Sequence, residues 1–186
     1  MFSLISRLVN GVQGGVTSSL KGVSDIAGTV LDVVKKITVS AVKETADLIK
    51  EGIKLPASIV QGALSGVAEI GSSVISSVKG VVKGTVEGVM ESGGKQDDAV
   101  KGAVGQAVHS AKELGVDIGD AALESVKGSI EAVKSVGGNT AEATKSAIMA
   151  ALEAAQGIGT EAVDSVKNTL TSGVDGAKQI IDSIKK

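Results

Sequence analysis

Apolar and polar positions recur along the chain with a period of eleven residues between Gly71 and Ile181. Eleven residues complete three turns at about 3.67 residues per turn, so positions eleven apart line up on one side of an α-helix. The adjacent apolar positions form an arc of roughly 130–160°, wider than a coiled-coil seam. The pattern therefore predicts long amphipathic helices whose apolar arc must be covered.

Two columns of charged residues accompany this apolar arc. The acidic column lies in the middle of the polar side, and His109 is its only non-acidic member between Glu87 and Asp175. The lysine column borders the arc, where the methylenes of a lysine can lie on apolar surface while its ammonium stays in water. The lysines that we assign to this boundary are Lys79, Lys101, Lys134 and Lys167.

Three segments interrupt the helical pattern. The only proline, Pro56, would cost about 3 kcal/mol inside a helix but is tolerated in a first turn, which predicts a break near residues 52–55. Residues 92–98 and 136–142 each contain a Gly-Gly pair and form the other two breaks. The predicted helices span about residues 3–51, 56–92, 97–136 and 139–184 of a single all-helical domain.

Local signals support these helices and their arrangement. Asp97 is a predicted N-cap, and Asn139 with Glu142 resembles a capping box. Similar six-residue segments begin at residues 30 and 74, which are 44 residues apart, as expected of a duplicated unit. Since short connections place neighbouring helices antiparallel, the sequence predicts an all-α fold, either an up-down four-helix bundle or paired helical hairpins.

The sizes of the apolar residues indicate that helices pack on helices. Along one column, glycine alternates with a large aliphatic residue, and the neighbouring column has the opposite order, which favours interdigitation. Small residues four apart mark one edge of the arc and permit close approach of two helices. These small pairs are Ser18/Gly22, Gly62/Gly66, Ser73/Ser77, Gly84/Gly88, Gly128/Ala132 and Ala150/Ala154.

The glycine content weakens each helix by itself. There are 25 glycines, and each one inside a helix costs about 0.8–1 kcal/mol relative to alanine. Order must therefore come from burial of the apolar arc against another helix, another chain or a lipid surface. A protein of this kind is expected to move its apolar arc from one of these partners to another.

Composition excludes several classes of protein. The chain has no cysteine and one aromatic residue, so disulfides, thiolate metal sites and aromatic stacking on nucleic acid are not expected. The formal charge of −2 provides no basic field for nucleic acid. We find no signal peptide and no apolar run long enough to cross a membrane, which predicts a cytoplasmic protein.

Candidate catalytic groups are few. His109 lies on the polar side, and the acid pairs Asp97/Asp98 and Asp117/Asp120 are typical of helix caps and solvated charges. Residues 93–95 resemble a phosphate-binding loop, but Gln96 replaces the required hydroxyl residue. We therefore predict no enzyme activity, no metal, no cofactor and no small-molecule substrate.

A family resemblance bears on function. Residues 82–89 (VKGTVEGV) and 171–178 (TSGVDGAK) resemble the repeats of long-repeat perilipins and, less closely, of synucleins. Those families use eleven-residue repeats as amphipathic helices that coat lipid droplets or vesicles. The resemblance implies a similar reversible lipid-coating role here.

Two functional hypotheses follow. The first is a non-enzymatic protein that binds a lipid surface through its apolar face, as a peripheral protein with the N-terminal segment as an anchor. The second is a self-associating, homo-oligomeric structural or stress-protective bundle or filament, for desiccation or ice binding, whose arc stays covered. The residues assigned to the lipid or helix-packing face are Phe2, Leu4, Ile5, Ile26, Ile37, Leu48, Ile59, Ile70, Val82, Leu114, Val126, Val136, Ile148, Ile158, Leu170 and Ile180.

Overall fold

The computed structural model describes residues 2–184, and all regular secondary structure in that range is helical. This confirms the predicted all-α class. The helices pack against one another in a bundle-like arrangement. In chain order they are α1 (Phe2–Leu20), α2 (Ile26–Glu44), the 3₁₀ helix η1 (Ala46–Glu51), α3 (Lys54–Glu69), α4 (Val74–Glu91), α5 (Gln96–Leu114), α6 (Ile118–Ser135), α7 (Thr140–Ile158), α8 (Thr160–Gly173) and α9 (Ala177–Ile184).

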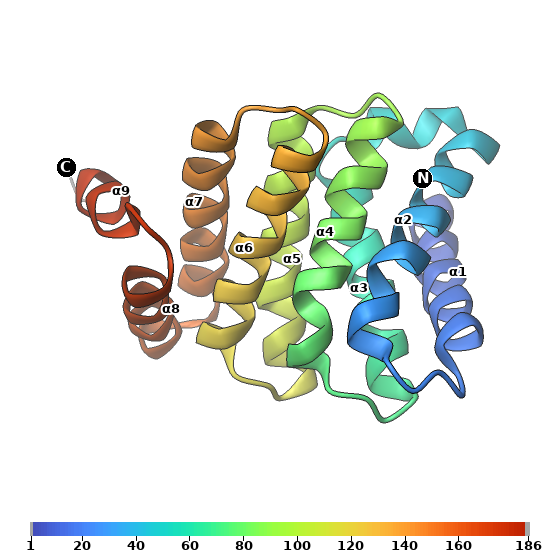
Figure 1. Ribbon diagram of the computed structural model, residues 1–186, viewed down its shortest axis with the longest axis horizontal. Coiled ribbons are helices and arrows are strands. Elements are labelled where there is room, and N and C mark those ends of the chain that lie inside the picture. The colour runs from blue at the N-terminus through green and yellow to red at the C-terminus, as the bar shows by residue number, and fades with distance from the viewer. Residues whose placement is uncertain (1, 185–186) are drawn as a thin grey trace.

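The α-helices form two layers that extend along the longest axis of the molecule (Figure 1). One layer contains α1, α3, α5, α7 and α9, and the other contains α2, α4, α6 and α8. Each helix packs mainly against the helix two places away in the chain, within its own layer, and against its sequence neighbours in the other layer. The pair α1 and α2 therefore stands at one end of this helical stack, and α8 and α9 stand at the other (Figure 1).

The helices are shorter than predicted. The structure has interruptions at the three expected places, but each predicted helix of about forty residues is divided further. The additional interruptions lie at residues 21–25, 45, 70–73, 115–117, 159 and 174–176. The predicted spans 3–51, 56–92, 97–136 and 139–184 were wrong because most of these interruptions centre on single glycines without a proline or a Gly-Gly pair.

Glycines in a left-handed backbone conformation end these helices. Gly71, Gly93, Gly115 and Gly137 have φ values between 72° and 96°, a region that residues with a Cβ rarely adopt. At each of them, two N–H groups return to carbonyls of the last helical turn, as in Gly93 N to Met90 O at 3.1 Å. These four glycines belong to the column in which glycine alternates with large aliphatic residues. The prediction that this alternation serves interdigitation of helices was wrong for them, because they make turns.

The structural unit that repeats most regularly is 22 residues long. Helices α4 to α7 begin at residues 74, 96, 118 and 140, which are 22 residues apart. The structure confirms Asn139 as the N-cap of α7, since its Oδ1 accepts a hydrogen bond from Glu142 N at 3.1 Å. The reciprocal bond of the predicted capping box is not formed, because Asn139 N donates to Gln96 Oε1 at 3.0 Å. The prediction for Asp97 was wrong, because Lys95 is the N-cap of α5 and Asp97 lies in its first turn. Pro56 lies in the first turn of α3, as expected.

Glycines inside the helices bring neighbours in one layer close together. A Cβ on Gly62 would lie 2.5 Å from the carbonyl oxygen of Val9 in α1, and one on Gly84 would lie 2.5 Å from that of Leu31 in α2. A Cβ on Gly128 would likewise lie 2.6 Å from the carbonyl oxygen of Lys79 in α4. The predicted small-residue edge is therefore a helix-packing edge at Gly62/Gly66, Gly84/Gly88 and Gly128/Ala132, whereas Ser18, Gly22 and Ser73 are exposed. A core of Val, Ala, Leu and Ile suffices to fill the narrow space.

Candidate functional site

An apolar groove lies at the N-terminal end of the helical stack, between α1, α2 and η1. It has a volume of about 720 Å³. The aliphatic residues that line it recur at helical spacing along α1 and α2, so one face of each helix contributes to the groove. The principal aliphatic side chains are Leu4, Leu8, Val12, Val33, Ile37 and Leu48.

The groove exists because α1 and α2 are the first members of their layers. Helix α3 packs on one side of α1, and α4 packs on one side of α2, but the described chain has no earlier helices for their opposite sides. Gly14 of α1 illustrates the difference, because a Cβ added there would meet no atom within 4 Å, whereas Gly62 and Gly66 of α3 each face α1 backbone. The groove thus lies where α1 and α2 are not covered by another helix of the described chain.

The polar groups of the groove differ between its two ends. Because residues 21–25 join the end of α1 to the start of α2, Ser19 shares one end with Lys36. Ser40 lies on the same face of α2, four residues from Lys36 and four from Glu44. At the opposite end, Arg7 and Glu44 line the groove together. Among the described residues, the end nearest the α1–α2 connection therefore has Lys36 and the Ser19 hydroxyl without a carboxylate in the lining.

The C-terminal end of the stack is more polar. Helix α8 exposes a stripe of polar side chains at helical spacing, Glu161, Asp164, Asn168 and Thr171, on the side away from its buried residues. Stacked helical repeats generally require such a polar outer face on their terminal units. The two ends are thus unequal, and the N-terminal end is the one with an apolar groove.

The residues assigned to the lipid or packing face are divided by the structure into two groups. Leu48, Ile59, Val82, Val126, Ile148 and Leu170 are buried in the helical core. Half-buried positions that pack against the core are Leu4, Ile26, Ile37, Ile70, Leu114, Ile158 and Ile180, while Ile5 and Val136 are also half-buried. The side chain of Phe2 lies outside the described part of the structure. Of the assigned set, Leu4, Ile37 and Leu48 line the groove.

The four boundary lysines have different surroundings. Lys79 Nζ lies 2.7 Å from Glu131 Oε1 of α6, and Lys101 Nζ lies 2.8 Å from Asp97 Oδ2 in its own helix. Lys134 is exposed, and Lys167 is half-buried. None of the four lines the groove, where the lysine is Lys36. The sequence did not indicate Lys36, because the boundary lysines were identified from the lysine column of the later repeats and Lys36 does not belong to that column.

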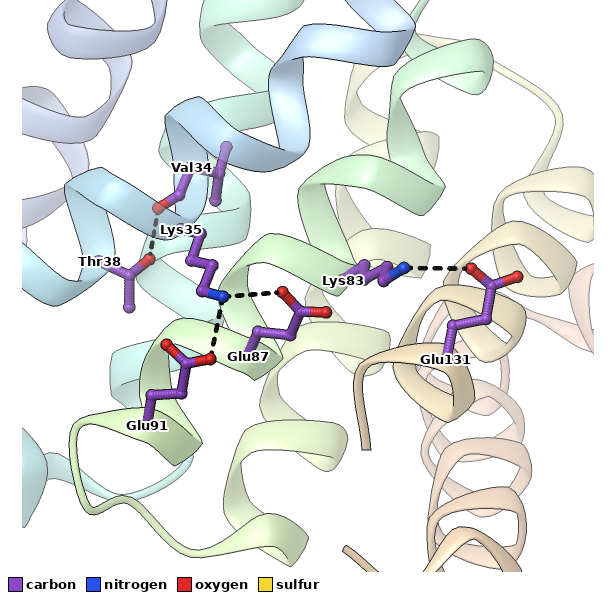
Figure 2. Close-up of polar contacts among 7 residues, drawn as sticks. All are labelled: Val34, Lys35, Thr38, Lys83, Glu87, Glu91 and Glu131. Carbon is purple, nitrogen blue, oxygen red and sulfur yellow. Dashed lines mark hydrogen bonds and ion pairs between the residues drawn. The ribbon is translucent and has the colours of Figure 1, made fainter. Parts of the chain in front are cut away.

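An ion pair between the first two helices of the second layer was also missed. Lys35 Nζ of α2 lies 3.4 Å from Glu87 Oε2 and 2.9 Å from Glu91 Oε1, both in α4 (Figure 2). Glu87 belongs to the acidic column assigned to the polar side, yet it is only 5% exposed. The equivalent pair one 44-residue step later is Lys79 with Glu131, so the same charge register recurs from α4 to α6.

Two of these contacts shift pKa values. The hydrogen bond from Lys35 to Glu91 raises the pKa of the Lys35 ammonium, and the charge of Glu87 adds to the effect. The hydrogen bond from Lys101 lowers the pKa of Asp97, and Ser146 Oγ of α7 also donates to Asp97 Oδ1 at 2.7 Å. Asp97 thus links α5 to α7 in its ionised form.

Asp97 makes stability dependent on acid pH. Because its folded-state pKa lies below the usual aspartate value of 3.8, its contribution is present above that pH and is lost as the pH falls through the lowered pKa. We expect Asp97→Asn to lower the melting temperature slightly at neutral pH and not at pH values below the lowered pKa. Thermal unfolding followed by circular dichroism across the acid range measures this, with Asp164→Asn, an exposed acid of α8, as the control.

The described residues provide little for catalysis. His109 is exposed on α5, and within residues 2–184 no group of three His, Asp or Glu side chains is placed to hold a metal ion. Asp117 caps α6, with its Oδ1 accepting a hydrogen bond from Asp120 N at 2.8 Å. A search of the same residues finds no helix with the length and apolar character of a membrane span.

The fold and the groove together define a class of protein, a two-layer stack of short α-helices with an apolar groove at one end. Comparison with known proteins adds no narrower assignment. No protein-family model matches the sequence, and no curated protein has significant similarity to it.

Proposed function

We propose that this protein is a non-enzymatic helical scaffold that binds reversibly to a lipid surface through its N-terminal end. The observation that carries the proposal is the apolar groove of α1 and α2, which lies at one extreme of the long axis (Figure 1). A flat surface can reach a groove at the end of a molecule without any rearrangement of the other helices. Arg7 and Lys36, both exposed, are available to lipid head groups beside the aliphatic lining.

This proposal uses a smaller surface than the complete apolar arc. Most strongly apolar positions of α3 to α7 are buried between helices, and Gly62, Gly84 and Gly128 approach the backbone of their neighbours closely. Exposing the whole arc to lipid would separate those helices and lose the buried area that stabilises them. Binding through the groove leaves these contacts intact.

The alternative is self-association, in which a second copy covers the groove and gives a homo-oligomeric structural protein. The half-buried apolar residues of the terminal helix pair are compatible with such an interface. The opposite end of the stack differs, with the polar stripe on α8 and the exposed Ile184 of α9. We therefore place lipid binding first and treat an oligomer as an outcome of the test.

Flotation with phosphatidylcholine vesicles tests the lipid proposal. We expect the wild-type chain to float with the vesicles, and the double variant Leu8→Gln with Ile37→Gln to reduce the bound fraction roughly tenfold, because two aliphatic contacts are lost. Both side chains are half-buried in the groove, so their exchange leaves the deeper core unchanged.

The matched control is Val163→Gln with Ile180→Gln, two half-buried aliphatic residues near the C-terminal end. This variant should float like the wild type. Equal loss in both variants would show that the complete arc binds lipid. Absence of flotation, together with a sedimenting oligomer that the groove variant dissociates, would replace the proposal with self-association.

A further inference from the structure

We propose that the groove holds a single aliphatic chain with an anionic head group, with the head at Lys36 and Ser19. The chain would extend toward Leu8 and Leu4. This inference rests on the proposed lipid-binding function, and it names the ligand chemistry of the same groove. A fatty-acid carboxylate is the simplest molecule of this class.

The size and lining of the groove favour an aliphatic chain. Its volume of about 720 Å³ lies within the range of roughly 300–1,000 Å³ that is usual for small-molecule sites. Among the residues whose side chains the structure describes, the apolar lining is aliphatic. Such walls offer contact to methylene groups.

The distribution of charge sets the direction of the ligand. Among the described residues, Glu44 is the only acid in the lining, and it lies at the same end as Arg7. Lys36 is about two helical turns away, toward the end where the Ser19 hydroxyl lies, and Ser40 is midway between Lys36 and Glu44. An ammonium with a hydroxyl donor suits a carboxylate or phosphate, whereas Glu44 would repel it.

The path from that end is long enough for a chain. Lys36 and Glu44 are eight residues apart on α2, about 12 Å at the helical rise of 1.5 Å per residue. Ile37, Ala41 and Leu48 follow along this direction, and Leu8 and Leu4 contribute from α1. A chain laid along the groove would therefore meet aliphatic side chains from both helices and from η1.

Titration with three twelve-carbon amphiphiles tests the inference by methyl NMR of the full chain. The ligands are dodecanoate and dodecyltrimethylammonium below their micelle concentrations, and dodecanol below its solubility limit. We expect saturable shifts at Leu8, Ile37 and Leu48, with dodecanoate binding the tightest. Lys36→Glu should weaken dodecanoate about fivefold and leave dodecanol unchanged, as expected for an exposed charge contact. The control Lys134→Glu makes the same charge change on exposed α6 surface.

The outcomes separate this inference from the proposed function. Equal affinity for all three amphiphiles, or no effect of Lys36→Glu on dodecanoate, would overturn the assigned head-group site. Vesicle flotation without any amphiphile shift would overturn the ligand and retain surface binding. Dodecanoate shifts without flotation would support the ligand and remove the lipid-surface role. Shifts that follow protein concentration in the absence of amphiphile would assign the groove to a second copy.

Discussion

Replacing Gly84 with alanine is expected to lower the free energy of unfolding by about 2–3 kcal/mol. The added Cβ would lie 2.5 Å from the carbonyl oxygen of Leu31 and 3.1 Å from the backbone nitrogen of Lys35. Both atoms belong to the backbone of α2, so relief requires the two helices to separate. This cost exceeds the gain of about 1 kcal/mol that alanine brings to a helix interior. Urea denaturation followed by circular dichroism measures the difference.

Gly105→Ala is the matched control for this experiment. Gly105 also lies inside a helix, α5, but a Cβ there would meet no atom within 4 Å. The same substitution should therefore stabilise the protein by about 1 kcal/mol through helix propensity alone. If Gly84→Ala were neutral or stabilising as well, the close approach of α2 and α4 would be wrong.

Replacing Lys35 with methionine should lower the free energy of unfolding by about 2 kcal/mol, because Glu87 would lose its charged hydrogen-bond partner. The Glu87 side chain is only 7% exposed, so water replaces the lost ammonium poorly. The raised pKa of Lys35 sets the pH range of this contribution. The contribution is complete below pH 10.5, the usual pKa of a lysine, and is lost as the pH rises through the raised pKa.

Lys79→Met provides the matched control for Lys35→Met. Its partner Glu131 occupies the equivalent place one 44-residue step later, but the Glu131 side chain is 43% exposed. Loss of that pair should cost less than about 1 kcal/mol. Adding Glu87→Gln to Lys35→Met should recover part of the lost stability, since it removes the buried charge. Equal losses for Lys35→Met and Lys79→Met would contradict the role assigned to burial.

Binding to lipid through one end of the molecule would leave most of the fold unchanged. Helices α3 to α7 would keep their packing in the bound and free states, because the groove involves α1, α2 and η1. Helicity would therefore change little on vesicle binding, in contrast to a chain that unfolds its bundle to coat a surface. The groove, with Lys36 at one end, would then be the part of the molecule that senses lipid.

Much of the candidate site could not be predicted from the sequence. The residues Leu4, Ile37 and Leu48 were assigned to the apolar face by their spacing, and they do line the groove. The same spacing selected Ile59, Val82 and Ile148, which are buried between helices. Periodicity identifies which side of a helix is apolar. Whether that side is buried depends on which helices lie before and after the helix in its layer.

By itself, the sequence determined that the chain is helical, that each helix has one apolar side and that Asn139 begins a helix. These features depend on local backbone conformation and on side chains a few residues apart. The tertiary structure alone decided the role of each glycine. Gly137 makes a turn, and Gly84 lets the backbone of a neighbouring helix approach closely. A Cβ added at Gly105 would meet no atom within 4 Å. The tertiary structure also decided that the apolar arc stays covered from α3 to α7 and opens beside α1 and α2. The reason is that burial of an arc requires a neighbour on both sides, and the first pair in a stack has a neighbour on only one.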